Sequence, residues 1–282
     1  MMRGRCLRVT KLSEGGTSAG SLKTSENYTA NDTVVCHGYA PLSKTEKLTI
    51  EIENFLNSKE FKIDYEYTGQ DIKVLVIRKD NSYRITVCIP FIAIKTPSHQ
   101  FYSEKKKLVS DKLSAFIVKS QLINDENFEL LINTKDTGNF AYLVSFGSAA
   151  DKGDYGAVGR GNRYSGVISV NRGTNVEAVS GKNSRNHSGK LYTILSYSLA
   201  SFVFKMINKA CQVIISTDNG RPLSDPVSVF VIFDDKNFIL EKKDEIKIRE
   251  KISFSFSNIN LLSSDILKRD PIEDFRNYFV YD

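Results

Sequence analysis

The sequence predicts an α+β protein built from two similar modules, each with a sheet and covering helices. Segments with helical spacing alternate with short β-branched runs that end in turn residues, which is typical of mixed sheets and helices. The same order of elements occurs twice, although no strict sequence repeat is visible. We therefore expect an irregular leader at 1–29, a first module at 30–135, and a second module with a glycine-rich loop and a tail at 136–282.

The first module begins with a helix signal. Ser43 and Glu46 form an S-x-x-E capping box and apolar residues follow at helical spacing, so we expect a helix at about 44–57. The runs "DIKVLVIR" and "YRITVCIPF" are separated by a turn-prone stretch and predict a hairpin. A polar helix at about 101–119 and the strand "FELLINT" complete a sheet covered on one face.

The second module is predicted to begin with the strand "FAYLVSFG", followed by a glycine-rich loop and the strand "SGVISV". A polar loop then leads into a helix with an apolar face over about 191–206 and into the strands "CQVIIST" and "PVSVFVIF". In the tail, "ISFSFS" fits a half-buried strand. The segment "DPIEDFRNYF" is expected to form a short helix or to wrap around the module as an extended segment. The tail carries no recognisable chemistry.

Composition and charge exclude several classes of protein. Apolar residues make up 41% and charged residues 26%, which argues against wholesale disorder. The net charge of +6 comes from interspersed basic and acidic residues, so a nucleotide or polyphosphate is a better partner than a nucleic acid. The four cysteines lie far apart and indicate neither zinc nor disulfides. With no signal peptide and no apolar stretch of membrane length, we expect a cytoplasmic protein without membrane contact.

The stretch "GDYGAVGRGNR", residues 153–163, is the densest glycine segment of the chain. Its glycines allow close approach of the backbone, and Arg160 and Arg163 carry permanent charges suited to phosphate or carboxylate. Asp154 adds a candidate metal ligand. The same composition also suits a mobile surface loop, so composition alone leaves both interpretations open.

A second polar loop precedes the long helix of the second module. Lys182 directly follows a glycine, but the residue after it is not Ser or Thr, so the Walker pattern is absent. His187 is either a general base or a residue that caps the helix, and no partner for a base is recognisable. Both polar loops adjoin strands, and we expect them to converge at one end of the sheet.

Four motifs together resemble the archaeal type of S-adenosylmethionine synthetase, also called methionine adenosyltransferase. They are "ANDT…GYAPLSKTEKL", "DIKV", "GDYGAVGRGNRYSG" and "EAVSGKNSRNHSGKLY", in the order and spacing of that family from about residue 30 to residue 200. The resemblance implies a fold of three similar modules around a pseudo-threefold axis, of which this chain would hold two. It also implies ATP and methionine as substrates, with Mg²⁺ and K⁺ as cofactors.

In such a reaction the methionine sulfur attacks C5′ of the ATP ribose, and the released triphosphate is then cleaved to pyrophosphate and phosphate. The resemblance implies that Asp32 faces the methionine amino group, that Lys73 reaches the triphosphate and the reaction centre, and that Asp154 holds the metal. The resemblance also implies six residues that contact the polyphosphate or another part of the substrate. They are Arg160, Lys182, Arg163, Asn162, Gly159 and Gly161.

The chain also departs from the family pattern. It lacks the family's "GHPD"-like motif, its "RVTKLSEGG" replaces the glycine-rich ATP loop, and Tyr155 and Ser184 replace an acidic residue and a proline. We therefore expect a chain that lacks the N-terminal module and forms a homodimer or pairs with a chain that supplies that module. Two alternatives stay open here: a catalytically degenerate homologue that acts as a nucleotide-binding or regulatory subunit, and a gene fragment.

Overall fold

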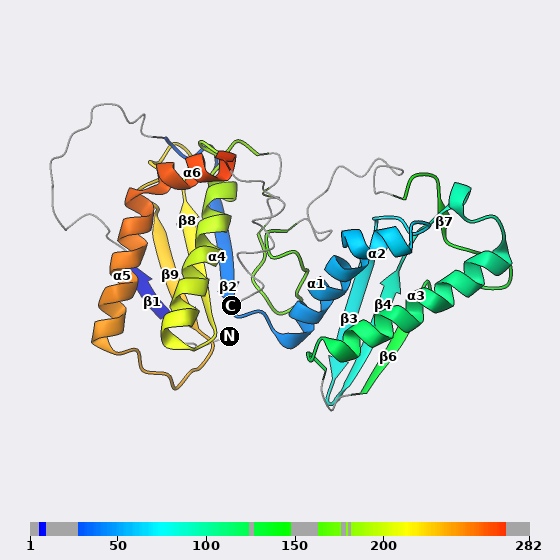
Figure 1. Cartoon of the computed structure of the whole chain (residues 1–282). Helices are drawn as coiled ribbons and strands as arrows, with labels where there is room; N and C mark the ends of the chain where they lie inside the picture. The colour runs from blue at the N-terminus through cyan, green and yellow to red at the C-terminus, as the bar shows by residue number, and fades with distance from the viewer. Residues whose placement is uncertain are drawn as a thin grey trace. The chain divides into compact units, whose positions relative to one another are not determined.

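A computed structural model describes residues 6–9, 28–123, 127–147, 163–175, 179 and 182–268. The chain divides into two compact units. Unit 1 comprises Met1–Pro41 and Ala157–Asp282, and unit 2 comprises Leu42–Gly156. Both combine a sheet with helices, as Figure 1 shows, so the predicted α+β class is confirmed.

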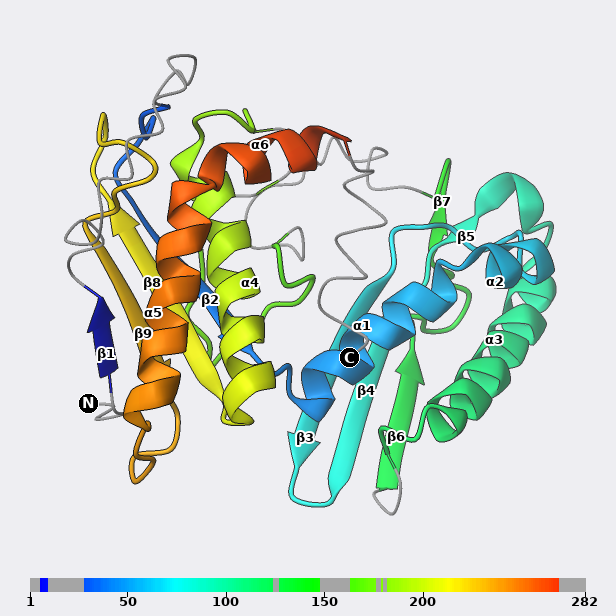
Figure 2. The same cartoon turned by 60° about the vertical axis from the view of Figure 1, so that its left-hand side comes forward.

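Unit 1 contains a four-stranded antiparallel sheet with helices on one face (Figure 2). The strands in spatial order are β1 (Cys6–Val9), β9 (Ser228–Phe233), β8 (Cys211–Thr217) and β2 (Val34–Ala40). The helices are α4 (Ser188–Ile207), α5 (Lys242–Ser257) and α6 (Ile259–Lys268). Figure 2 shows α4 and α5 side by side along the sheet, with α6 crossing their ends.

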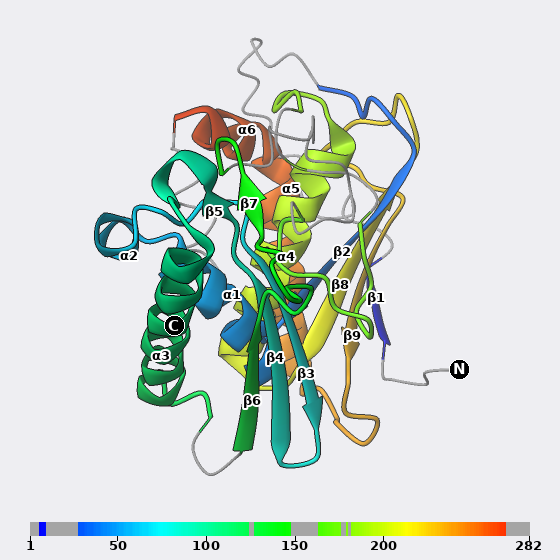
Figure 3. The ribbon, with the colours of Figure 1, turned by 90° about the vertical axis from the view of Figure 1, so that its right-hand side faces the viewer.

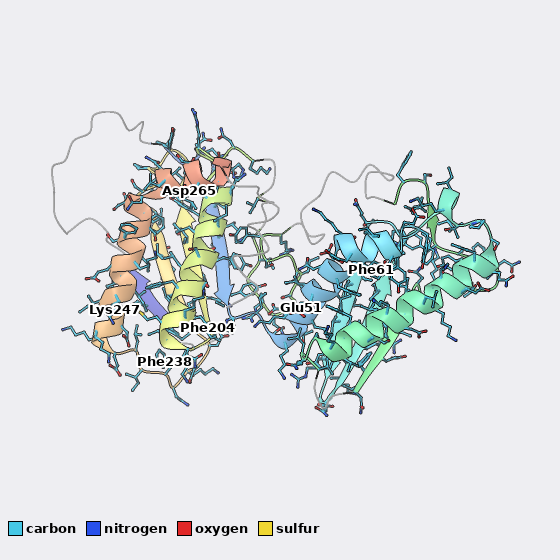
Figure 4. The ribbon with its side chains drawn as sticks, viewed as in Figure 1. Glu51, Phe61, Phe204, Phe238, Lys247 and Asp265 are labelled. Atoms are coloured by element: carbon cyan, nitrogen blue, oxygen red, sulfur yellow. The ribbon has the colours of Figure 1, made fainter. Side chains whose placement is uncertain are left out.

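The core of unit 1 lies between this sheet and α4. Alternate residues of β8 are buried, in register with the strands on both sides, because successive side chains of a strand point to opposite faces. The apolar stripe that the sequence predicted on α4 is buried against them and includes Leu191, Leu195, Leu199 and Val203. Phe204 and Phe238, labelled in Figure 4, pack against the same core at the end of α4 where Ile207 lies.

Unit 2 contains a three-stranded sheet with two long helices on one face (Figure 3). Strand β4 (Ser82–Cys88) lies between an antiparallel and a parallel neighbour, which are β3 (Lys73–Lys79) and β6 (Asn127–Ile132). The helices are α1 (Lys44–Leu56), α2 (Lys59–Asp64), α3 (His99–Lys119) and the short η1 (Ala93–Lys95). A separate pair of short parallel strands is formed by β5 (Phe91–Ile92) and β7 (Leu143–Val144).

The strongest local signals of the sequence are confirmed. Ser43 and Glu46 form the predicted capping box, in which each side chain accepts a hydrogen bond from the other residue's backbone N–H at 3.2 and 2.6 Å. Strands β3 and β4 form the predicted hairpin, with Asp80 in the left-handed region at φ 53°. The predicted polar helix corresponds to α3, and "FELLINT" forms β6.

One predicted strand of the tail is wrong. The segment "ISFSFS" belongs to helix α5, although Ile252, Phe254 and Phe256 alternate with serines as in a strand. The buried residues of this helix are Ile248, Ile252 and Phe256, which are four positions apart and share one helical face. Phe254 is 63% exposed, so the alternation that suggested a strand does not correspond to burial.

Other boundaries also differ from those expected. "SGVISV" forms no strand in the described stretch 163–175, and of "FAYLVSFG" only Leu143–Val144 is extended in a sheet. The expected irregular leader contains β1, which pairs with β9. The division expected at residue 135 differs from the observed one because β2 pairs with β8 along its whole length and packs on α4. The expected helix or wrap at 270–279 lies outside the described residues.

No helix in the described parts of the chain is long and apolar enough to cross a membrane.

Lys62 of α2 is a half-buried lysine with backbone and side-chain partners. Its ammonium donates to the carbonyl oxygen of Gly69 at 2.6 Å and to the hydroxyl of Thr68 at 3.2 Å. Burial lowers the pKa of Lys62 to about 8, and the nearby carboxylate of Glu53 opposes this shift only in part. Figure 4 labels the adjacent Phe61, whose ring lies under the ammonium at 5.7 Å.

This pKa predicts how the stability of the protein depends on pH. Between about pH 8 and pH 10.5 the unfolded chain binds more protons at Lys62 than the folded chain, so the free energy of unfolding increases with pH. The increase is expected in the wild type and not in Lys62→Met. Urea unfolding at about pH 7 to pH 10 measures it as the difference between the two proteins. Parallel pH profiles of the two proteins would contradict the prediction.

Candidate active site

The start of helix α4 organises the polar residues of unit 1. His187 is its N-cap, and the imidazole Nδ1 accepts a hydrogen bond from the backbone N–H of Lys190 at 3.1 Å. This interaction satisfies one of the N–H groups that lack a partner within the helix. Of the two roles considered for His187, the structure therefore supports capping.

The turn at Asn31 and Asp32 is attached to the same helix end. The side-chain oxygen of Asn31 accepts from the backbone N–H and the hydroxyl of Ser188 at 2.9 and 3.2 Å, and the Ser188 hydroxyl also donates to the carbonyl oxygen of Asp32 at 2.9 Å. Ser188 is fully buried, whereas Asp32 is exposed. The Asp32 carboxylate accepts a hydrogen bond from the backbone N–H of Thr33 at 2.8 Å.

Asn31→Ala is expected to destabilise the start of α4. It removes the acceptor of two hydrogen bonds from a buried residue, with an expected loss of about 1–2 kcal/mol in the free energy of unfolding. Asn31→Asp retains an acceptor oxygen at this place and serves as the matched control. Urea unfolding of the three proteins measures the loss, and equal stability of wild type and Asn31→Ala would contradict the structural role.

Two lysines lie at the start of α4. The ammonium of Lys190 donates to the backbone carbonyl oxygen of Lys182 at 3.0 Å and so holds the loop on which Lys182 lies. Burial lowers the pKa of Lys190. A cation in the first turn of a helix is unfavourable for the helix dipole, so this end of α4 concentrates positive potential. Such a site attracts anions, phosphates among them.

Arg163 is the last residue of the glycine-rich stretch 153–163. Its Nε and Nη1 atoms are buried and have no hydrogen-bond partner among the described residues. The next residue, Tyr164, contacts Tyr197 of α4 with ring centroids 5.3 Å apart, and Tyr197 contacts Tyr39 of β2 at 5.1 Å. These aromatic contacts fix the end of the segment on α4. A buried donor without a partner costs about 1–3 kcal/mol, which an anionic ligand would offset.

The chain after Arg163 attaches to the free edge of β2. The amide of Asn175 accepts from the backbone N–H of His37 and donates to its carbonyl oxygen at 3.0 Å, as a neighbouring strand would do. A Cβ on Gly173 would lie 2.5 Å from Nδ1 of His37, so the His37 ring would have to shift to admit any other residue there. The guanidinium of Arg172 lies 4.5 Å from the ring centre of Tyr39. The sequence analysis missed these contacts because polar loop residues carry no periodicity.

Lys73 lies in unit 2, at the first position of edge strand β3. Its ammonium forms an ion pair with the Asp71 carboxylate at 2.6 Å, and its side chain is 51% exposed. The turn before it contacts the residues that lead into the glycine-rich segment, because the carbonyl oxygen of Gly147 accepts from the backbone N–H of Asp71 at 3.0 Å. A Cβ on Gly69 would lie 2.5 Å from the Cα atom of Gly147. Gly147 therefore lies against the turn that precedes Lys73.

The structure thus places some of the predicted residues and leaves others outside the described residues. Asp32 and Lys182 lie at one end of α4, and Arg163 is anchored to the same helix through its neighbour Tyr164. Lys73 belongs to the other unit. The predicted site residues outside the described ranges are Asp154, Gly159, Arg160, Gly161 and Asn162. Within the described ranges, no three His, Cys, Asp or Glu residues gather in a way that could hold a metal ion.

Fold and site together define an α+β protein with two lysines at the start of a long helix, an arrangement suited to an anion such as a phosphate. The sequence model of the family described as S-adenosylmethionine synthetase (AdoMet synthetase) matches residues 9–270. The chain therefore belongs to the S-adenosylmethionine synthetase family.

Three relatives named S-adenosylmethionine synthase illustrate the similarity. The protein of Methanothermobacter thermautotrophicus is 37% identical over 70% of this chain and 50% of its own length. That of Methanococcus vannielii is 35% identical over 84% of this chain and 59% of its own. That of Pyrococcus furiosus is 32% identical over 87% of this chain and 60% of its own. The chain spans about half to three fifths of the length of these relatives.

Proposed function

We propose that this chain acts as a methionine adenosyltransferase, which forms S-adenosylmethionine from ATP and methionine and releases pyrophosphate and phosphate. The observation that carries the proposal is the start of α4, where Asp32 and Lys182 lie at one helix end in a chain of this family. A carboxylate suits the ammonium of methionine, and a lysine beside a helix N-terminus suits a polyphosphate.

The reaction needs little covalent chemistry from the protein, because the methionine sulfur is itself the nucleophile. The protein has to align the sulfur with C5′ and to stabilise the negative charge of the leaving triphosphate. We assign charge stabilisation to Lys73, Arg160, Lys182 and Arg163, and orientation of the methionine amino group to Asp32. Asn162, Gly159 and Gly161 are proposed to bring the backbone close to the substrate.

We propose Mg²⁺ and K⁺ as the cofactors. Magnesium is usually held by one or two carboxylates together with substrate phosphates. Asp154 could therefore serve as the single protein ligand, and a larger cluster of acidic residues is not needed. When bound, the ion neutralises charge on the polyphosphate. No described residue is assigned to K⁺.

We also propose that the chain works as a homodimer or with a chain that completes its site. The support is the open face of the unit 2 sheet, where Leu75 and Ile77 of β3 are 57% and 49% exposed. Apolar sheet surface of this kind is usually covered by a partner. Sedimentation equilibrium tests this point. We propose a cytoplasmic location, which is supported by Cys36, Cys88 and Cys211, since these cysteines form no disulfide among the described residues.

Product binding tests the proposal without requiring turnover. In calorimetric titrations the chain is expected to bind S-adenosylmethionine and Mg²⁺-tripolyphosphate, each more tightly in the presence of the other because both are products of the first chemical step. Asp32→Asn is expected to weaken binding of S-adenosylmethionine and to leave tripolyphosphate binding unchanged. Binding of neither ligand to the wild-type chain would contradict the proposed function.

A further inference from the structure

The turn at residues 69–71 directly precedes Lys73, the first residue of strand β3. The N–H groups of Gln70 and Asp71 both donate to the carbonyl oxygen of Gly147, at 2.5 and 3.0 Å. The Asp71 carboxylate in turn pairs with the ammonium of Lys73 at 2.6 Å. The position of this turn therefore limits where the ammonium of Lys73 can lie.

Lys62 of α2 holds the carbonyl side of the same turn. Its ammonium donates to the carbonyl oxygen of Gly69 at 2.6 Å and to the hydroxyl of Thr68 at 3.2 Å. Thr68 is buried, and its hydroxyl donates to the carbonyl oxygen of Tyr65 at 2.8 Å, so this side chain is itself held in place. Lys62 thus ties helix α2 to the backbone of the turn.

Asn57, the C-cap residue of α1, holds the next carbonyl group of the turn. Its side-chain amide donates to the carbonyl oxygen of Gln70 at 3.1 Å and to the Glu53 carboxylate at 2.6 Å. Asn57 is a neutral donor, whereas Lys62 is a charged one. Hydrogen bonds from charged donors are roughly twice as strong as those between neutral groups. Lys62 is therefore the stronger of the two side-chain anchors.

We propose that Lys62 is a positioning residue, which fixes the turn at Gly69 so that the ammonium of Lys73 is directed at the polyphosphate of the substrate. The identity of this anion rests on the proposed function, whereas the contacts of Lys62 do not. A cation stabilises a leaving group best when it is already aligned, because small displacements of a charged group are costly in catalysis. Lys62 acts through the turn and does not itself touch the substrate.

The burial of Lys62 supports a role beyond holding the backbone. A neutral donor would suffice to satisfy a carbonyl oxygen. Burial lowers the pKa of Lys62 to about 8, so the ammonium is kept in this place against an unfavourable desolvation. Residues with perturbed pKa values are concentrated at functional sites.

The test compares Lys62→Met with the wild type and with the matched control Lys59→Met. Methionine is an unbranched, apolar side chain that cannot donate to Gly69 or Thr68. Lys59 lies three residues earlier in α2 and is exposed, and its replacement changes the net charge equally. Thermal unfolding first checks that the proteins are folded. Lys62→Gln, which keeps a neutral donor, takes the place of Lys62→Met if that protein is unfolded.

The first readout is hydrogen exchange at the N–H groups of Gln70 and Asp71, measured by NMR without any substrate. Both rates are expected to increase about threefold to tenfold in Lys62→Met relative to the rate at Ile85, and to stay unchanged in Lys59→Met. Ile85 lies in the central strand β4 and reports on opening of the whole sheet. Unchanged relative rates in Lys62→Met would overturn the role of Lys62 in fixing the turn.

The second readout is the affinity for Mg²⁺-tripolyphosphate. Lys62→Met is expected to weaken binding about threefold to tenfold in the wild-type background and to have no effect in a Lys73→Ala background. An equal loss in both backgrounds would overturn the positioning role, since Lys62 would then act without Lys73. A wild-type chain that binds no tripolyphosphate would overturn the proposed function and the anion assigned to Lys73, whatever the exchange rates show.

Discussion

Lys182→Ala is expected to weaken the binding of Mg²⁺-tripolyphosphate about 10-fold to 150-fold. Lys182 lies in the loop that Lys190 holds against the start of α4, where the helix dipole also favours an anion. Its removal takes away a charge-assisted contact worth about 1.5–3 kcal/mol. Arg160→Ala should have an effect of the same size. Isothermal titration calorimetry at fixed salt measures the affinities.

Lys205→Ala is the matched control for Lys182→Ala. Lys205 lies in the last turn of α4, so its removal changes the net charge equally at the opposite helix end. We expect its affinity to stay within about twofold of the wild type, since a distant exposed charge contributes little at moderate salt. If the two lysine variants lose affinity equally, the anion is held by net charge and not at the start of α4. Unchanged affinity in Lys182→Ala and Arg160→Ala would exclude the assigned site.

Gly38→Ala is expected to cause the largest loss of stability among single substitutions in unit 1. Strand β2 and helix α4 approach so closely at this glycine that an added Cβ would lie 2.2 Å from backbone atoms of Ser196 and Tyr197. Backbone atoms in the middle of a packed helix cannot move aside individually. Insertion of atoms into such a contact typically costs about 1–3 kcal/mol and occasionally more, and we expect the upper part of this range.

Gly220→Ala separates this clash from the general effect of replacing a glycine. Gly220 has φ +79° and no heavy atom within 4 Å of an added Cβ, so its substitution strains the backbone without a steric clash. We expect a loss of about 1–2 kcal/mol, which is smaller than that of Gly38→Ala. Urea unfolding of both variants gives the order. A larger loss in Gly220→Ala would show that β2 and α4 are not packed as described.

Much of the fold could be predicted because its signals are local. The capping box of Ser43 and Glu46, the turn between β3 and β4 and the apolar stripe of α4 are each encoded within a few neighbouring residues. The "ISFSFS" segment shows the limit of this approach. The alternation of apolar residues with serines in this segment fits a strand. The buried helical face becomes visible only when Ile248, one turn earlier, is considered together with Ile252 and Phe256.

Pairing between distant segments could not be predicted. Strand β1 is recognised as a strand only through its partner β9, more than two hundred residues later. In the same way, β2 belongs to unit 1 because it pairs with β8, which no local pattern near residue 135 could indicate. These contacts depend on the whole topology, whereas sequence periodicity reports only on one segment at a time.

In the candidate site, too, local motifs could be recognised from the sequence, whereas contacts between distant segments could not. Asp32, Lys73 and Lys182 were recognised from motifs, but the groups that hold the turn at Asp32 were not, namely Asn31 and Ser188. A single asparagine or serine carries no pattern of its own. The pair Gly69 and Gly147 could have been noticed as isolated glycines next to polar loops, which often mark a close approach of two backbones.

The most direct test is the formation of S-adenosylmethionine by the purified 282-residue chain supplied with ATP, methionine, Mg²⁺ and K⁺. Product is quantified by mass spectrometry, with pyrophosphate and phosphate followed in parallel. The account predicts S-adenosylmethionine together with equal amounts of pyrophosphate and phosphate, and a strong loss of all three in Lys182→Ala. A folded wild-type chain that binds tripolyphosphate but forms no S-adenosylmethionine would contradict the proposed activity and favour a nucleotide-binding or regulatory role.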